Sequence, residues 1–196
     1  MDVGILSSGG KDSTLAALLL DSMCEVTLLC GTFGITDDWE HANEAARAVG
    51  FPACKLSLDP EVAHDAAARI VSDGYPRHGI QQVHEHALSV AAQADYDAIA
   101  DGTRRDDRVP RVERPLAQQI EDRHGVAYIA PLAGVGRQAV DTLTDDLLTV
   151  ETGPSEAISK GDYETELRAL IAREYGQETV QTLFPAHTQS RVVGRR

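Results

Sequence analysis

The sequence predicts an α/β fold: a five-stranded parallel sheet of strand order 3-2-1-4-5 with helices on both of its faces. Short apolar segments alternate with longer helical segments along the chain, which is the pattern of successive βαβ units. The first apolar segment runs straight into a turn with two adjacent glycines, and an alanine- and leucine-rich segment follows. A length of 196 residues and a hydrophobic content of 42% suit one domain with a sizeable core.

The first half of the chain contains three of the expected strands. These strands cover residues 3–6, 25–29 and 53–58, and helices are expected at 13–23, 37–50, 59–72 and 80–94. Local signals mark helix ends, because Pro60 occupies a first helical position and Gly50 follows a last one. The unbroken apolar run at 3–6 is typical of a parallel strand that is buried on both faces.

The second half supplies the remaining strands and a tail. Strands are expected at 97–100 and 127–130, and helices at 114–123, 138–148 and 163–175. The step from Gly153 to Pro154 separates a domain of residues 1–152 from a C-terminal extension of the same domain, residues 153–196. Three roles stay open for this extension: closing over a site, forming a homodimer, or binding a substrate.

The turn after the first strand has the chemistry of a polyphosphate cradle. Its residues are Ser8, Gly9, Gly10, Lys11, Asp12 and Ser13. The glycines expose consecutive N–H groups, and the following helix directs its positive end to the same place. Lys11 adds positive charge, and Asp12 adds a carboxylate for Mg²⁺. The Walker pattern does not fit, because it requires glycine where Ile5 stands and Ser or Thr where Asp12 stands.

This turn resembles the PP-loop of the ATP pyrophosphatases, S-G-G-x-D-S, at every position. That superfamily, also described as adenine nucleotide alpha hydrolase-like, includes NAD, GMP and asparagine synthetases and tRNA 2-thiolation enzymes. The resemblance covers about residues 1–140 and implies a Rossmann-like fold of the HUP type, with ATP and Mg²⁺ as cofactors. It assigns catalytic roles to Lys11 and Asp12 and cofactor contacts to the whole turn. The alternative is a glycine-rich turn without a ligand.

A second polar stretch, from Asp101 to Asp107, leaves the end of the fourth strand. In the expected strand order this stretch faces the cradle across the switch point of the sheet. It resembles the G-[TH]-x-x-D-D stretch of PP-loop enzymes. The resemblance implies that Gly102 and Thr103 lie near the α-phosphate, and that Asp107 or Asp106 joins Asp12 at the metal, with Asp107 counted as catalytic. The alternative is a solvated turn.

Arginines crowd the same region of an otherwise acidic chain. They are Arg104, Arg105, Arg108, Arg111 and Arg114. Guanidinium groups suit phosphates, so this cluster predicts capture of a phosphorylated substrate, of the leaving pyrophosphate, or of tRNA, the last through Arg104, Arg105, Arg108 and Arg111. The alternative is pairing within the loop with Asp106, Asp107 and Glu113.

Other candidate residues carry weaker signals. The resemblance implies that an apolar side chain covers adenine; Phe33 is either that cover or a packed core aromatic. His84 and His86 do not share a helix face as zinc ligands do, so these residues and His78 are expected to be ordinary surface or core histidines. The cysteines, which are Cys24, Cys30 and Cys54, do not predict an iron–sulfur cluster.

The formal net charge of -13, with only three lysines, resembles the salt-adapted surfaces of halophilic archaeal proteins. This charge opposes non-specific nucleic-acid binding at low salt, although high salt screens the repulsion. No apolar run is long enough to span a membrane, and no signal peptide precedes the first strand. The sparse cysteines favour a reducing compartment, so the expected location is the cytoplasm.

The expected activity is adenylylation. A substrate oxygen attacks ATP, AMP is transferred, pyrophosphate leaves, and a nucleophile then displaces AMP. Sulfur and ammonia both stay open as the nucleophile, supplied free or by a donor protein. The prediction leans to tRNA base modification such as thiolation. The alternatives are an ammonia-dependent small-molecule ligase and a sensor that binds ATP without turnover.

Overall fold

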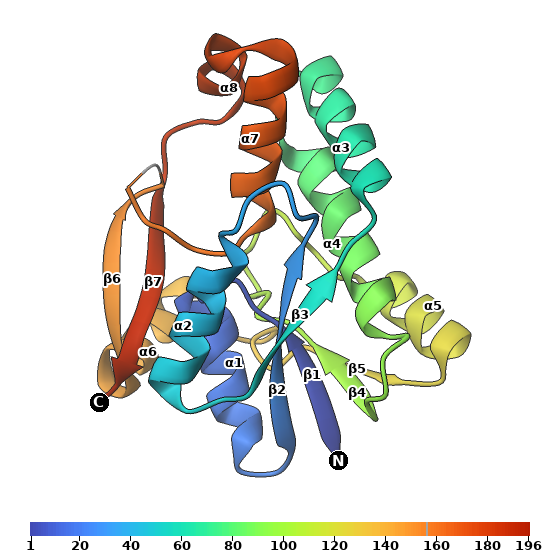
Figure 1. Cartoon of the computed structure of the whole chain (residues 1–196). Coiled ribbons are helices and arrows are strands. Elements are labelled where there is room, and N and C mark those ends of the chain that lie inside the picture. The colour runs from blue at the N-terminus through green and yellow to red at the C-terminus, as the bar shows by residue number, and fades with distance from the viewer. Residues whose placement is uncertain (156) are drawn as a thin grey trace.

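The computed structural model describes residues 1–155 and 157–196 and confirms the predicted α/β fold. Its main sheet has five parallel strands in the order β3-β2-β1-β4-β5 (Figure 1). The strands are β1 (Asp2–Leu6), β2 (Glu25–Thr32), β3 (Ala53–Ser57), β4 (Ala98–Ala100) and β5 (Ala127–Ile129). Ile5 in the central strand pairs with Leu28 on one side and with Ala100 on the other. The carboxyl ends of β1 and β4 are therefore neighbours, as the strand order predicts.

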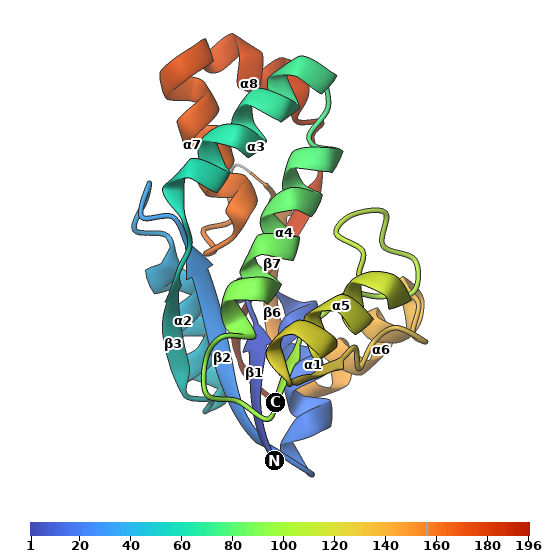
Figure 2. The ribbon, with the colours of Figure 1, turned by 90° about the vertical axis from the view of Figure 1, so that its right-hand side faces the viewer.

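Helices cover both faces of this sheet (Figures 1 and 2). One face carries α1 (Lys11–Asp21), α2 (Trp39–Val49) and α6 (Arg137–Leu147). The other face carries α3 (Pro60–Asp73), α4 (Arg77–Ala91), α5 (Arg114–His124), α7 (Tyr163–Tyr175) and α8 (Gln177–Leu183). Side chains of β1 pack in two apolar clusters, one on each face of the sheet. Val3 and Ile5 pack towards α1 and α2, whereas Leu6 packs towards α3 and α4.

Small residues allow the helices to lie close to the sheet and to one another. Ala63, Ala66 and Ala67 of α3 are fully buried, and they face α4 and α7 within a single apolar cluster. At the contact with α4, a Cβ on Gly79 would lie 2.5 Å from Ile70 Cγ1. The low aromatic content of the chain thus corresponds to a core of closely packed aliphatic side chains.

The tail forms regular structure that the sequence patterns did not reveal. The strands β6 (Leu148–Pro154) and β7 (Thr188–Arg195) pair in an antiparallel ribbon with a register shift at Thr149/Val150. Leu148 and Val192 of this ribbon are buried in the cluster that also contains residues of α1 and α2. Because β6 crosses the predicted boundary between residues 152 and 153, the chain after that point is built into the molecule rather than appended to it. No helix among the described residues has the length and apolarity needed to span a membrane.

Candidate active site

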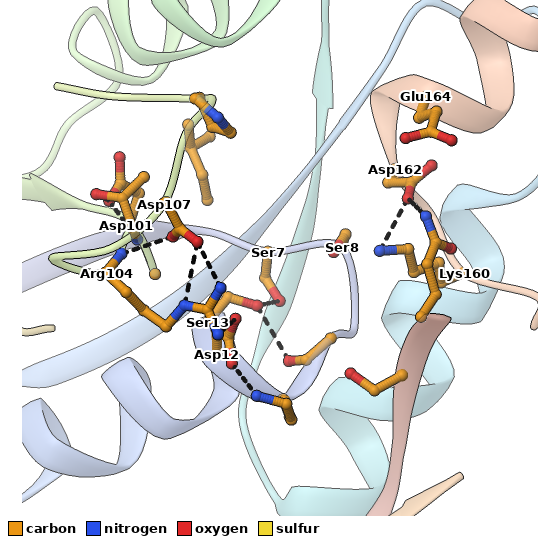
Figure 3. A pocket seen from close by; sticks show the side chains of 18 of the residues that line it. Ser7, Ser8, Asp12, Ser13, Asp101, Arg104, Asp107, Lys160, Asp162 and Glu164 are labelled. Atoms are coloured by element: carbon orange, nitrogen blue, oxygen red, sulfur yellow. Dashed lines mark hydrogen bonds and ion pairs between the residues drawn. The ribbon is translucent and has the colours of Figure 1, made fainter. Parts of the chain in front are cut away.

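A cavity of about 560 Å³ opens at the carboxyl edge of the parallel sheet, where β1 and β4 end. One wall consists of the β1–α1 turn and the loop after β4. The opposite wall consists of residues 160–164 and 187–190, which come from the tail (Figure 3). This position, at the switch point of a doubly wound sheet, and this size suit a small-molecule ligand.

The turn between β1 and α1 has the backbone of an anion cradle. Gly9 has φ +79, and a Cβ there would lie 3.1 Å from Ala42 Cα, so glycine is required. Gly10 is extended (φ -77, ψ 163) and caps α1 without any side-chain hydrogen bond to the helix. The first N–H groups of α1 are left for a ligand, and the helix dipole points the same way.

Lys11 lies at the mouth of this cradle between two carboxylates. Its Nζ is 2.6 Å from Asp12 Oδ1 and 2.9 Å from Asp141 Oδ1. Asp141 belongs to α6, and nothing in the sequence indicated that this helix reaches the turn. All three side chains line the cavity and are only partly exposed, so the two carboxylates fix the position of the Lys11 ammonium and balance its charge.

The loop after β4 meets the cradle as the sequence predicts. A Cβ on Gly102 would lie 2.5 Å from Ser13 N and 2.7 Å from Ser13 Cα. Only glycine permits this contact, because both atoms belong to the backbone of α1. Gly102 and Thr103 line the cavity together with Ser8 and Ser13, so these four predicted cofactor contacts are brought together.

Arg104 occupies the space between the two carboxylates that were expected to share a metal ion. Its Nη1 is 3.5 Å from Asp12 Oδ2. Asp107 accepts from the backbone N of Arg104 at 2.7 Å through Oδ2 and from Nε at 3.1 Å through Oδ1. Burial alone would lower the pKa of Arg104, but the hydrogen bond to Asp107 and the nearby carboxylates raise it. The guanidinium is therefore a fixed positive charge at the cavity.

The donor set fits Mg²⁺ through one carboxylate rather than two. Asp12 faces the cavity, and Mg²⁺ is commonly held by one or two carboxylates together with substrate phosphates. Asp107 uses both of its oxygens on Arg104. Asp106 accepts from Arg137 N at 2.9 Å, at the start of α6; this hydrogen bond is the main cause of its lowered pKa. Asp106 is not among the residues that line the cavity.

A buried polar network forms the floor of the cavity at the end of β4. Asp101 is 1% exposed and accepts from His84 Nε2 at 2.8 Å, from Thr103 Oγ1 at 2.6 Å and from Tyr128 Oη at 3.1 Å. Burial by itself would raise the pKa of Asp101, but the hydrogen bonds and the charge of His84 lower it. Burial and the charge of Asp101 raise the pKa of Tyr128. His84, expected to be an ordinary surface or core histidine, is buried, and nothing in the sequence indicated its pairing with Asp101.

Comparison with known proteins assigns the whole chain to one family. Residues 1–194 match a protein family described as a family of unknown function, DUF7411. The chain belongs to this family. A relative from Methanocaldococcus jannaschii, Uncharacterized protein MJ0690, is 38% identical over 195 residues, which are 99% of this chain and 96% of the relative.

A solved structure from Methanocaldococcus jannaschii has the same fold. It is described as the crystal structure of a predicted subunit of tRNA methyltransferase. Its TM-score against this chain is 0.90 at 37% sequence identity, and the match covers 100% of this chain and 98% of that one. The fold and the DUF7411 membership are thus established by comparisons that extend over the full length.

The wall opposite the cradle comes from the part of the chain that the motif resemblance did not reach. Gly161 N donates to Ser8 O at 3.2 Å, and Val192 N donates to Gly9 O at 2.9 Å. A second lysine, Lys160, lines this wall and lies 2.9 Å from Asp162 Oδ2. The tail therefore holds the cradle in place and adds a charged pair across the cavity from Asp12 and Ser13 (Figure 3).

Phe33 lies in the core instead of covering the cavity. Its side chain is 7% exposed and packs in the cluster formed by α3, α4 and α7, which agrees with the packed-aromatic alternative. The aromatic residue that lines the cavity is Tyr163; a Cβ on Gly31 at the end of β2 would lie 3.0 Å from its Cε1. The ring of Tyr163, and not that of Phe33, therefore borders the cavity beside β2.

A buried carboxylate from α7 fixes the loop that follows β2. Glu166, 3% exposed, accepts from Thr32 Oγ1 at 2.9 Å, from Phe33 N at 2.9 Å and from Ile35 N at 3.0 Å. Two of these bonds satisfy the backbone N–H groups of Phe33 and Ile35, which have no partner in a neighbouring strand. No local pattern in the sequence predicts this contact, because Glu166 lies 133 positions after Phe33 in the chain.

Of the remaining candidates, Arg104 lines the cavity and the others do not. Arg104 was expected to contact tRNA, but its side chain is 9% exposed and committed to carboxylates, so it is unavailable to a large ligand. Arg105, Arg108 and Arg111 are exposed. Burial raises the pKa of Cys30 to about 12, and Cys54 is exposed. Among residues 1–155 and 157–196, no group of three His, Cys, Asp or Glu side chains is arranged to hold a metal ion.

Proposed function

We propose that this protein is a PP-loop ATP pyrophosphatase that transfers AMP from ATP to a substrate oxygen. The observation that carries the proposal is the uncapped start of α1. Its free N–H groups, the required Gly9 and the side chain of Lys11 converge on one cavity beside Gly102. An uncapped helix start with a lysine suits the phosphates of a nucleotide.

Each side chain of the cradle has a role in this reaction. The N–H groups of the turn and Lys11 bind the β- and γ-phosphates, and Arg104 adds a second fixed cation beside them. Thr103 and the backbone at Gly102 lie by the α-phosphate, where the acceptor oxygen attacks. Asp12 holds Mg²⁺, which neutralises charge on the departing pyrophosphate. Lys11, Arg104 and Mg²⁺ interact more strongly with the negative charge that develops on the departing pyrophosphate than with bound ATP. This difference stabilises the transition state.

The acceptor in this proposal is a base of tRNA, and the reaction is a base modification such as thiolation. Support comes from the full-length relative described as a predicted subunit of tRNA methyltransferase and from exposed arginines in the loop after Asp107. The nucleophile that displaces AMP is sulfur or ammonia from a donor protein. An ammonia-dependent ligase acting on a small molecule shares the first half of this reaction.

A second candidate is a subunit that binds ATP without hydrolysing it. The observation that favours it is that both carboxylates expected at the metal are paired with side-chain cations. Asp107 is held by Arg104, and Asp12 pairs with Lys11 and Arg104. A binding subunit needs the cradle but not a metal-assisted leaving group. The two candidates differ in whether AMP is formed.

The test is incubation with ATP labelled at the α-phosphate, with and without tRNA, at high salt. We expect labelled AMP, and we expect Lys11→Ala to lower its rate by about 10²- to 10³-fold, as removal of one charge-stabilising group does in other enzymes. Lys55→Ala is the matched control, because Lys55 lies on β3 over the ring of Trp39 and outside the cavity. ADP as the product would disprove the proposal, and ATP binding without any product would favour the second candidate.

A further inference from the structure

A second cavity, of about 330 Å³, lies on the far side of the loop that follows Asp107. It is formed by one side of α4, the loop residues around 108–113 and the start of α5. Three arginines line it, Arg77, Arg108 and Arg111, together with His78, Gln81, Glu85, Glu113, Pro115 and Leu116. Arg77 was not part of the arginine cluster in the sequence, because it precedes that cluster by many positions. The helix α4 places it at the same cavity as Arg108 and Arg111.

The three arginines are available to a ligand. None of them forms an ion pair with a carboxylate of residues 1–155 or 157–196, although the chain carries a large excess of acidic residues. Other arginines do form such pairs: Arg104, Arg191 and Arg195 each contact an aspartate or glutamate. Glu85 and Glu113 also line the cavity, but neither is within ion-pair distance of these guanidinium groups. The three guanidinium groups can therefore bind an added anion without first breaking an ion pair.

The loop that carries two of these arginines is fixed to α4. Gln81 Nε2 donates to Arg111 O at 2.7 Å, and Arg111 N donates to Gln81 Oε1 at 2.8 Å. The same Nε2 donates to Glu85 Oε1 at 2.9 Å, which engages one of the two glutamates of the cavity. His78 is held by Asp73 at 2.7 Å. The backbone at Arg111 is therefore fixed against α4 without any ligand.

The two cavities share their dividing elements. On α4, Ile80 and His84 line the first cavity, whereas Arg77 and Gln81 line the second. On the loop, Val109 and Pro110 line the first cavity, whereas Arg108 and Arg111 line the second. A polymer with regularly spaced negative charges can therefore lie on the arginines while one of its units reaches over the loop into the first cavity.

We propose that Arg77, Arg108 and Arg111 bind the phosphodiester backbone of an RNA whose neighbouring nucleotide enters the first cavity. The ligand class follows from the RNA acceptor of the proposed function, on which this inference rests. Guanidinium groups bind phosphate oxygens in pairs, and a strand of RNA presents such oxygens at each nucleotide. The site supplies positioning and leaves the choice of base to the first cavity.

The test measures tRNA binding by fluorescence anisotropy over a range of KCl concentrations in which circular dichroism reports an unchanged fold. We expect each of Arg77→Ala, Arg108→Ala and Arg111→Ala to weaken binding about tenfold at the lowest salt and to reduce the slope of log K against log salt by about 1. Arg47→Ala is the matched control, because Arg47 is exposed on α2, at the other side of the sheet, and its loss changes the net charge equally. ATP binding should be unchanged in all four variants.

Each result has a definite consequence. Equal losses in Arg47→Ala and the three cavity variants would overturn the site, because general charge would then explain them. Displacement of tRNA by polyglutamate of equal charge would overturn the assignment to RNA and favour an acidic protein. Arginine-dependent tRNA binding in a chain that forms no AMP would disprove the proposed activity and leave this site standing.

Discussion

The two walls of the first cavity carry similar charges but arise in different ways. The cradle wall is encoded within six consecutive residues, and its lysine contacts the adjacent Asp12. The opposite wall is assembled from residues 160–164 and 187–190, which reach the cavity through the β6–β7 ribbon and α7. A local motif thus forms the proposed phosphate cradle, whereas tertiary pairing forms the opposite wall and fixes the loop after β2.

Substitutions in the cradle wall should cause the largest losses of AMP formation. Asp12→Asn removes the carboxylate expected to hold Mg²⁺, so AMP formation should fall by at least about 10²-fold with a smaller change in ATP binding. Asp107→Asn should lower turnover less, because Asp107 acts by holding Arg104. Both rates are measured with α-labelled ATP at saturating Mg²⁺, and ATP binding is measured separately.

The two aspartates would share one role if the sequence-based prediction that Asp107 joins Asp12 at the metal is right. In that case Asp107→Asn would raise the Mg²⁺ concentration needed for half-maximal turnover as strongly as Asp12→Asn does. An unaltered Mg²⁺ dependence in Asp107→Asn, with weaker ATP binding, would support the role in holding Arg104.

Substitutions in the tail, which carries the opposite wall, should cause the largest losses in the free energy of unfolding. Glu166→Ala leaves the buried donors at Thr32, Phe33 and Ile35 without an acceptor, so the free energy of unfolding should fall by about 3 kcal/mol. Glu178→Ala, on the exposed face of α8, is the control and should change stability by less than about 0.5 kcal/mol. Chemical denaturation at high salt measures both variants. Similar losses in the two would contradict the role of Glu166.

The sequence could predict the features that depend on local patterns, but not those that depend on tertiary contacts. Strand order, the cradle and the approach of Gly102 to α1 were predictable, because alternating apolar segments and glycine positions are local signals. The ribbon was missed because β6 directly continues α6 without a turn, so one expected helix covered Leu148. Asp141 and Glu166 were missed because their partners lie more than 100 positions away in the chain.

The buried network below the cavity should give a smaller, pH-dependent effect. The pKa of Asp101 lies below its ordinary value of about 3.9, so the folded state binds this proton less readily than the unfolded state. Its contribution to stability is therefore complete above about pH 4 and is lost as pH falls through the lowered folded value. The difference in unfolding free energy between the natural chain and Asp101→Asn should be constant near neutral pH and shrink below pH 4. A difference that does not vary with pH would show that the carboxylate is not charged in the folded protein.

The smallest expected effect is that of the cysteines. A sulfur relay through this chain needs an exposed thiol of low pKa, whereas Cys30 lies within β2, is 1% exposed and has a pKa raised to about 12. A variant in which Cys24, Cys30 and Cys54 are replaced by Ala or Val should form AMP at the unaltered rate, and anaerobically purified protein should contain neither iron nor labile sulfide. Because Cys54 is exposed on β3, away from both cavities, its replacement alone should also leave AMP formation unchanged. Loss of tRNA thiolation with intact AMP formation in the cysteine-free variant would instead mean that sulfur from the donor passes through a cysteine of this chain on its way to the acceptor.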